Sequence, residues 1–149
     1  MSERSEELHA AFAARLERVR GAMSDEEFSH LVDDVIRTMQ RFEEIVAANA
    51  DKPLYLVEVC TKIGISARSL RMHCFDHIGM SPHRYLWLRR MNQVRRALSL
   101  ADPQQMTVTK IATDYGFLEL GRFSVGYRRL FGEPPSVTLR ACRRAAVTT

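Results

Sequence analysis

The chain has 149 residues, of which 46% are hydrophobic and 27% charged, an ordinary composition for a soluble globular protein with a core. Residues 1–50 hold 6 Lys/Arg against 11 Asp/Glu, whereas residues 51–149 hold 16 against 7, so a net charge of −5 is followed by one of +9. This split is typical of a polyanion-binding module joined to another segment. Three cysteines without metal or redox spacing, and no apolar run near the ~20 residues of a membrane span, favour a cytoplasmic protein.

Two helices are predicted in a helical N-terminal arm over residues 1–50. Apolar residues at spacings of four, four and three predict a helix over about residues 8–20. A capping-box sequence at 24–27 then starts a second helix, whose apolar stripe continues to about residue 49. We interpret this stripe as a core-facing side of the helix, with a dimerisation seam as the alternative. The sequence Asp51-Lys52-Pro53 breaks the pattern and ends the arm.

The same short pattern then occurs twice, offset by 52 residues before an internal glycine and by 53 after it. The first copy reads Val59-Cys60-x-x-x-Gly64-Ile65-Ser66, followed by Leu70, Cys74 and Gly79-Met80-Ser81-Pro82. The second reads Ile111-Ala112-x-x-x-Gly116-Phe117, followed by Phe123, Tyr127 and Gly132-Glu133-Pro134-Pro135. Each copy predicts a helix, a turn at a glycine and a second helix that ends at a glycine. This is the outline of a helix-turn-helix, whose second helix can enter a DNA major groove.

The predicted fold class is all-α, with two homeodomain-like helix-turn-helix subdomains joined by a long connecting helix. We expect the first motif over about 54–79, the connecting helix over about 81–100 and the second motif over about 107–132. A terminal helix over 136–144 and a disordered tail over 145–149 follow. The connecting helix would span about 28 Å, a length suited to the about 34–36 Å between successive major-groove faces. The sequence therefore predicts a two-pronged DNA reader.

Over about residues 40–144 the chain closely resembles the two-motif DNA-binding domain of the AraC/XylS family of bacterial transcription regulators. The more specific half is Ile111-Ala112-x-x-x-Gly116-Phe117-x-x-x-x-Arg122-Phe123-Ser124-x-x-Tyr127-x-x-x-Phe131-Gly132-x-x-Pro135-Ser136. The first half matches at Gly64-Ile65-Ser66-x-x-x-Leu70, Gly79-Met80-Ser81-Pro82-x-x-Tyr85 and Arg90-Met91. The resemblance implies sequence-specific regulation of transcription on double-stranded DNA, in the bacterial cytoplasm and nucleoid, without catalysis, metal or cofactor. In members that activate, RNA polymerase is a further implied partner.

Base contacts are expected on the exposed faces of the two recognition helices. In the first helix, the face opposite Leu70 and Cys74 presents Arg68, Arg71 and Met72. An arginine there can donate a bidentate pair to guanine, with a phosphate contact as the alternative. In the second helix, the resemblance maps base contacts to Glu119, Leu120, Gly121, Arg122 and Val125. Because most of these are small or apolar, we expect the first motif to carry more sequence information.

Phosphate contacts are expected to supply most of the affinity and to make it fall steeply with salt. The predicted set lies near helix starts or on the recognition helices and comprises Ser66, Arg90, Thr109, Lys110, Ser124 and Arg128. Arg90 is placed in this set by the resemblance. An ion pair between Arg90 and Asp114 is the alternative.

Some features leave other interpretations open. Family members commonly carry a separate effector-binding or dimerising domain, and only about 50 residues precede the first motif, so the chain is either a fragment of a longer regulator or a short stand-alone member. In the alternative function, residues 1–50 pair with a partner helix or a second copy, and the protein antagonises a full-length relative. A metal enzyme with ligands at His73 and His77 is disfavoured because no third ligand has a suitable spacing. A DNA-repair protein that couples a reactive cysteine to this module is disfavoured because residues 1–53 contain no cysteine. Cys60 and Cys74 are interpreted as small packing residues.

Overall fold

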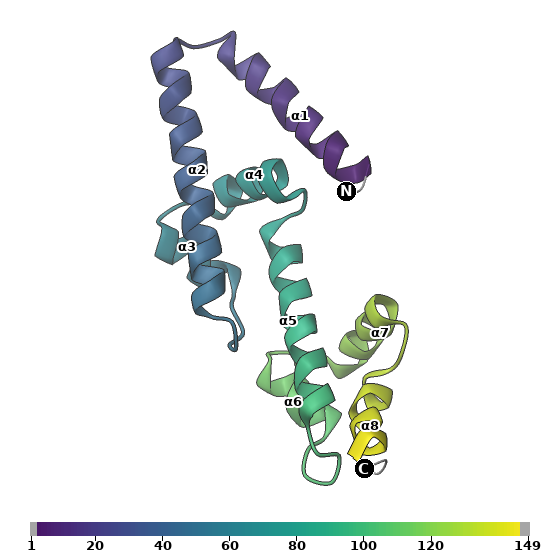
Figure 1. The fold of residues 1–149 in the computed structure, drawn as a ribbon. Helices are drawn as coiled ribbons and strands as arrows, with labels where there is room; N and C mark the ends of the chain where they lie inside the picture. Colours follow the sequence, from purple (N-terminus) through teal and green to yellow (C-terminus); the bar gives the residue numbers. More distant parts are fainter. Residues whose placement is uncertain (1–2, 147–149) are drawn as a thin grey trace. The chain divides into compact units, whose positions relative to one another are not determined.

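The computed structural model describes residues 3–146, with side chains for residue 10 and residues 13–141, and this region consists of helices and connecting turns without strands (Figure 1). The predicted all-α class is confirmed. The helices are α1 (Glu3–Arg20), α2 (Asp25–Ala48), α3 (Leu56–Ile63), α4 (Ala67–Ile78), α5 (Pro82–Leu100), α6 (Val108–Asp114), α7 (Leu120–Phe131) and α8 (Pro135–Ala146). The terminal helix extends two residues beyond the expected end at 144, and the rest of the predicted tail, 147–149, lies outside the described residues.

The chain divides into two compact units. Unit 1 contains the residues up to 50 together with 54–86, and unit 2 contains 51–53 together with the residues from 87 onward. α2 therefore belongs to the same unit as α3 and α4, although the sequence places a domain boundary after residue 50. That boundary stays a prediction. α5 contributes its first turn to unit 1 and its remaining length to unit 2.

Unit 1 is built by packing the two N-terminal helices against the first motif (Figure 1). α1 packs on α4, and α2 packs on both α3 and α4. The hydrophobic core cluster of this unit runs from α2 to the start of α5 and comprises Met39, Phe42, Leu54, Val59, Leu70, Cys74 and Leu86. Met39 and Phe42 are each 1% exposed, so the carboxyl-terminal half of the α2 stripe faces the core, as predicted. Burial of each such side chain stabilises the unit by roughly 1.5–3 kcal/mol.

The two turns confirm the repeat. Gly64 and Gly116 have φ angles of 82° and 80°, a left-handed conformation that glycine adopts without a steric cost. The Gly64 N–H donates to the Cys60 carbonyl at 2.8 Å, and the Gly116 N–H donates to the Thr113 carbonyl at 2.9 Å. Between the glycine and the next helix lie two residues in the first turn (65–66) and three in the second (117–119), of which Leu118 is 80% exposed.

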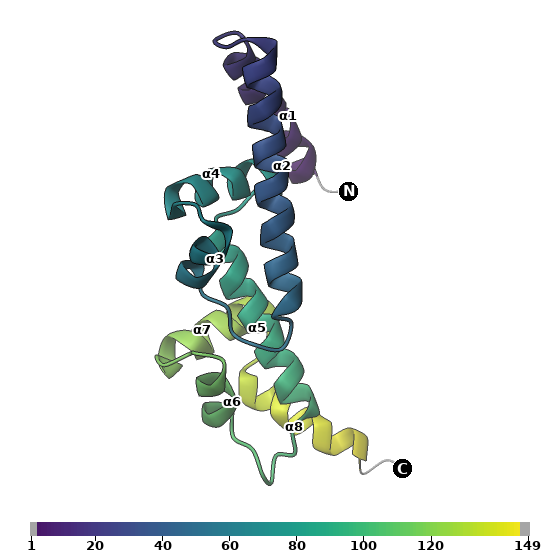
Figure 2. The same ribbon diagram turned by 90° about the vertical axis from the view of Figure 1, so that its left-hand side faces the viewer.

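Unit 2 has a core in which α5 contributes beside α6, α7 and α8 (Figure 2). Its buried members are Met91, Val94, Leu98, Ile111, Ala112, Phe117, Phe123, Tyr127 and Leu139. Aromatic rings run through it in sequence, with centroid separations of 4.9 Å for Phe117–Phe123, 5.7 Å for Phe123–Tyr127 and 4.6 Å for Tyr127–Phe131. Phe117, Phe123 and Tyr127 are core residues, as the sequence predicts. This core fixes α7 in unit 2 and leaves its other side exposed.

Gly126 is the position at which α7 packs closely against the side chains of Trp87 and Met91. A Cβ atom at this position would lie 3.0 Å from Trp87 and 3.2 Å from Met91. We expect Gly126→Ala to lower the free energy of unfolding of unit 2 by about 1–3 kcal/mol, because the helix and its neighbours must separate. Urea unfolding monitored by fluorescence of Trp87, the single tryptophan, measures this loss.

Gly121 provides the matched control in the same helix. A Cβ atom there meets nothing within 4 Å, so Gly121→Ala should gain the helix propensity of alanine, about 0.5–1 kcal/mol. If both substitutions changed the free energy of unfolding of unit 2 equally, close packing at Gly126 would not be a source of destabilisation.

Candidate nucleic-acid interface

The predicted recognition helix of unit 1 is α4, and local signals fix both of its ends. The Ser66 hydroxyl accepts from the Ser69 N–H at 3.1 Å and caps the amino terminus. Gly79 ends the helix at a φ of 81°. Leu70 and Cys74 are both 0% exposed, so they define the inner face of α4. The opposite face is exposed at positions 67, 68, 71, 72 and 75, whereas Asp76 is half-buried in its ion pair with Arg15 of α1.

That exposed face carries the predicted base contacts of the first motif. Arg68, Arg71 and Met72 are exposed together with Phe75, which is 49% exposed. Within the described residues, neither Arg68 nor Arg71 has an ion-pair partner, so both guanidinium groups keep their donors for another molecule. The sequence interpretation missed Phe75 in this set. Its spacing of four from Arg71 and seven from Arg68 is the signal that places it on the same helical face.

The predicted recognition helix of unit 2 is α7, and its exposed face is more heterogeneous. The exposed residues are Gly121, Arg122, Ser124, Val125, Arg128 and Arg129. Arg122 Nε lies 3.1 Å from Glu119 Oε2, so two predicted base contacts form an ion pair with each other. Leu120 is half-buried and packs against the unit 2 core, whereas Leu118, outside the predicted set, is exposed. Arg122 is the longest donor among the predicted base contacts of this helix, and it is already engaged.

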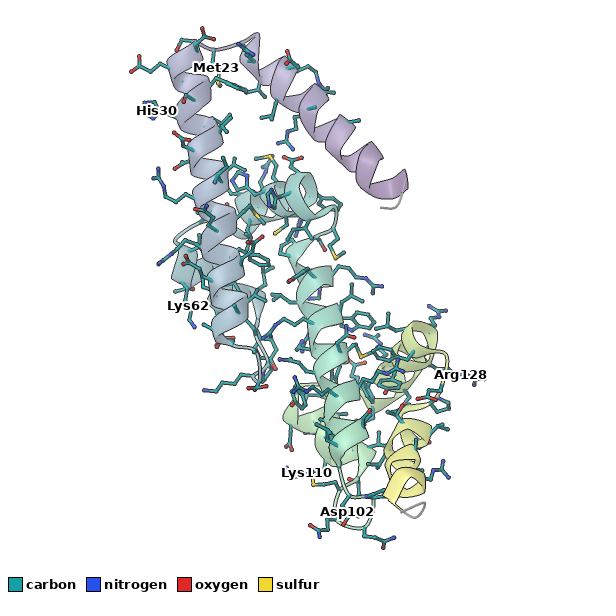
Figure 3. The ribbon with its side chains drawn as sticks, viewed as in Figure 1. Met23, His30, Lys62, Asp102, Lys110 and Arg128 are labelled. Carbon is teal, nitrogen blue, oxygen red and sulfur yellow. The ribbon has the colours of Figure 1, made fainter. Side chains whose placement is uncertain are left out.

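The predicted phosphate contacts have two kinds of environment. Ser66, Thr109, Lys110, Ser124 and Arg128 are exposed, and Figure 3 shows Lys110 on α6 and Arg128 on α7. Arg90 instead is half-buried, with its guanidinium carbon 5.1 Å from the centroid of the Phe117 ring. The Asp114 carboxylate, considered above as its partner, accepts from Lys110 Nζ at 2.7 Å. Arg90 therefore contributes to packing in unit 2 whether or not it also contacts phosphate.

Comparison with known proteins agrees with this geometry. A family described as a helix-turn-helix domain matches residues 59–141, which contain α4 and α7. A probable AraC family transcriptional regulator from Rhodopseudomonas palustris CGA009 is similar in structure, with a TM-score of 0.61 and 33% identity over 71% of this chain and 97% of that one. The chain belongs to the AraC/XylS family of transcription regulators.

Curated relatives in the AraC/XylS family include longer proteins. The probable thc operon regulatory protein of Rhodococcus erythropolis is 39% identical over 97 residues, 65% of this chain and 29% of that protein. The XylDLEGF operon transcriptional activator of Pseudomonas putida is 35% identical over 107 residues, 72% of this chain and 33% of that protein. The chain thus spans about a third of the length of these relatives. Over residues 3–146, no helix combines the length and apolarity that a membrane crossing requires.

The two neighbours Cys74 and Phe75 lie on different faces of α4. Cys74 is buried in the core of unit 1, and Phe75 is 49% exposed. Burial, and to a lesser degree the nearby Cys60, raises the pKa of the Cys74 thiol to about 12. Burial also raises the pKa of Cys60, which is only half-buried and packs against the same core. Both thiols therefore stay protonated and behave as apolar packing groups.

His73 makes the stability of unit 1 depend on pH. Burial lowers its pKa below the ordinary value of 6.5, and Arg15 lowers it further, while Asp76 and Asp34 act in the opposite direction. The unfolded chain therefore binds more protons between the folded pKa and 6.5, so stability is fully present above 6.5 and falls as the pH decreases through this window. We expect His73→Gln to flatten this dependence in thermal unfolding measured across that range. His30→Gln, at an exposed position of α2, is the matched control, and an equal flattening by it would contradict the assignment.

Proposed function

We propose that the protein is a sequence-specific regulator of transcription that inserts α4 and α7 into successive major-groove faces of double-stranded DNA. The observation that carries the proposal is that each unit buries one face of its second motif helix and exposes the other, with arginine on the exposed face. A helix held in this way matches the width of a major groove, and arginine is the most common donor to guanine.

The two recognition helices are expected to contribute unequally. On α4, Arg68 and Arg71 have no competing ion pair among the described residues, whereas Arg122 on α7 is paired with Glu119. Glu119 also places a negative charge at the amino end of α7, where a phosphate would otherwise be favoured. We therefore assign most of the sequence information to unit 1, and mainly backbone contacts to unit 2.

The alternative function through residues 1–50 has less support. A partner-binding helix needs an apolar face that the protein itself does not use. In α2, Met39 and Phe42 are buried in the core of unit 1. The carboxyl-terminal half of that face is therefore already occupied within this chain. Contact with RNA polymerase stays a prediction.

Selection of random-sequence DNA by the purified protein, at two salt concentrations, tests the proposal. We expect an enriched motif with two half-sites about one helical turn apart, and with the information concentrated in one of them. Affinity should fall steeply with salt because bound phosphates release counterions. Salt-sensitive binding without any enriched sequence would contradict sequence-specific recognition and leave only a basic surface.

A further inference from the structure

Unit 1 contains a cavity lined by residues of α1, α2 and α4, here named the three-helix cavity. Figure 1 shows the course of these three helices. Its volume is about 390 Å³. Its walls are mainly aliphatic, with Leu16 and Val19 from α1, Val32 and Val35 from α2, and Met72 from α4. An apolar cavity of about 150 Å³ is large enough for benzene, and ligand pockets begin at about 300 Å³. The three-helix cavity therefore has the size of a site for a molecule of one or two rings.

The described polar groups that line this cavity are Arg15, His73, Asp76 and the exposed His77. Arg15 Nη1 donates to both carboxylate oxygens of Asp76, at 2.8 and 2.6 Å, so these two charges compensate each other. His73 is uncharged at neutral pH because burial lowers its pKa below 6.5. A charged ligand would lose its hydration against the aliphatic walls, and the paired Arg15 and Asp76 offer it no uncompensated charge, whereas an uncharged ligand keeps the aliphatic contacts.

The cavity also reaches the candidate DNA-binding surface. Met72 lines the cavity and is 44% exposed on the face of α4 that carries Arg71. The ion pair between Arg15 and Asp76 ties α1 to α4 at the same place. A molecule packed against Met72 therefore constrains a side chain of the recognition surface and the helix tied to it.

We propose that the three-helix cavity binds an uncharged, predominantly apolar small molecule of one or two rings, and that its occupancy changes the affinity of the protein for DNA. The second part of this proposal rests on the proposed function. The first part concerns the free protein and does not depend on DNA binding. Since a methionine side chain is flexible and polarisable, Met72 can adapt to the ligand without repacking of Leu70 or Cys74 behind it.

The test titrates the whole chain with naphthylmethanol, which is uncharged, and with naphthoate, its anionic counterpart, by isothermal titration calorimetry. Val32→Trp and Val19→Trp fill the cavity from two different helices, and circular dichroism and thermal unfolding establish that each variant is folded. Val57→Trp is the matched control, because Val57 is 77% exposed on α3 and does not line the cavity. We expect saturable binding of naphthylmethanol to the unmodified protein and to the control, and its loss in both filled variants. Naphthoate should bind at least about tenfold more weakly.

Other results would overturn the proposal. Absence of saturable binding, or binding that persists in both filled variants, would exclude the cavity as the site, and equal binding of naphthoate would exclude the uncharged class. A dimer that both filled variants convert into a monomer would identify a second copy as the occupant.

A separate measurement addresses regulation. At saturating naphthylmethanol, the Kd for a selected DNA site should change by at least about fivefold, and the change should vanish in the filled variants. An unchanged Kd would overturn the regulatory part. Failure of the unliganded protein to select any DNA would instead count against the proposed function, and the calorimetric titration would still decide the ligand site.

Discussion

Replacing Tyr127 by alanine is expected to lower the free energy of unfolding of unit 2 by about 3–5 kcal/mol. Tyr127 is 0% exposed and its ring lies between Phe123 and Phe131. Its hydroxyl donates to Thr138 Oγ1 at 2.9 Å, which links α7 to α8. Removing the side chain leaves a cavity where both helices meet, and urea unfolding followed by Trp87 fluorescence measures the loss.

Tyr127→Phe is the matched control, because it keeps the ring and removes only the hydroxyl. Thr138 retains one hydrogen bond in this variant, since its own hydroxyl donates to Glu133 Oε1 at 2.6 Å. We therefore expect a loss of about 0.5–1.5 kcal/mol. Equal losses in the two variants would show that the hydrogen-bond link, and not aromatic packing, holds α7 in place.

The motif boundaries were predictable because their signals are local. A glycine at the turn, a serine that caps α4 and a proline at the start of α5 each act within a few residues of the boundary that they set. The insertion after the second turn was also visible as a change of offset from 52 to 53. The sequence did not show which leucine this insertion turns toward the core. Only the packing shows that Leu120 faces the unit 2 core and Leu118 faces outward.

The packing of the N-terminal helices could not be predicted in the same way. Arg15 and Asp76 are 61 residues apart in the chain, and no local pattern connects an arginine of α1 with an aspartate near the end of α4. The three-helix cavity depends on this contact and on the crossing of α1, α2 and α4. By contrast, the pair of Glu119 and Arg122 has a spacing of three, and its sequence does contain the signal for an ion pair on one helical face.

Replacing Arg71 by alanine is expected to raise the Kd for the selected DNA by about 5- to 150-fold and to relax specificity at one base position. Arg122→Ala should have a smaller effect, because its guanidinium is shared with Glu119 at 3.1 Å and that pair must rearrange on DNA. Arg37→Ala, on the exposed side of α2 and outside both recognition helices, is the control and should leave the Kd nearly unchanged. Fluorescence anisotropy with the selected site and with single-base variants measures both affinity and specificity.

Glu119→Gln separates the two explanations for a weak contribution from Arg122. If the ion pair restrains Arg122, removing the carboxylate charge should tighten DNA binding and enlarge the effect of a subsequent Arg122→Ala substitution, as a double-mutant cycle would show. If Arg122 simply lies away from the bases, Glu119→Gln should tighten binding by the same factor in the presence and absence of Arg122, through loss of repulsion from phosphate alone. A larger effect of Arg122→Ala than of Arg71→Ala in the unmodified background would show that unit 2, not unit 1, carries most of the sequence information.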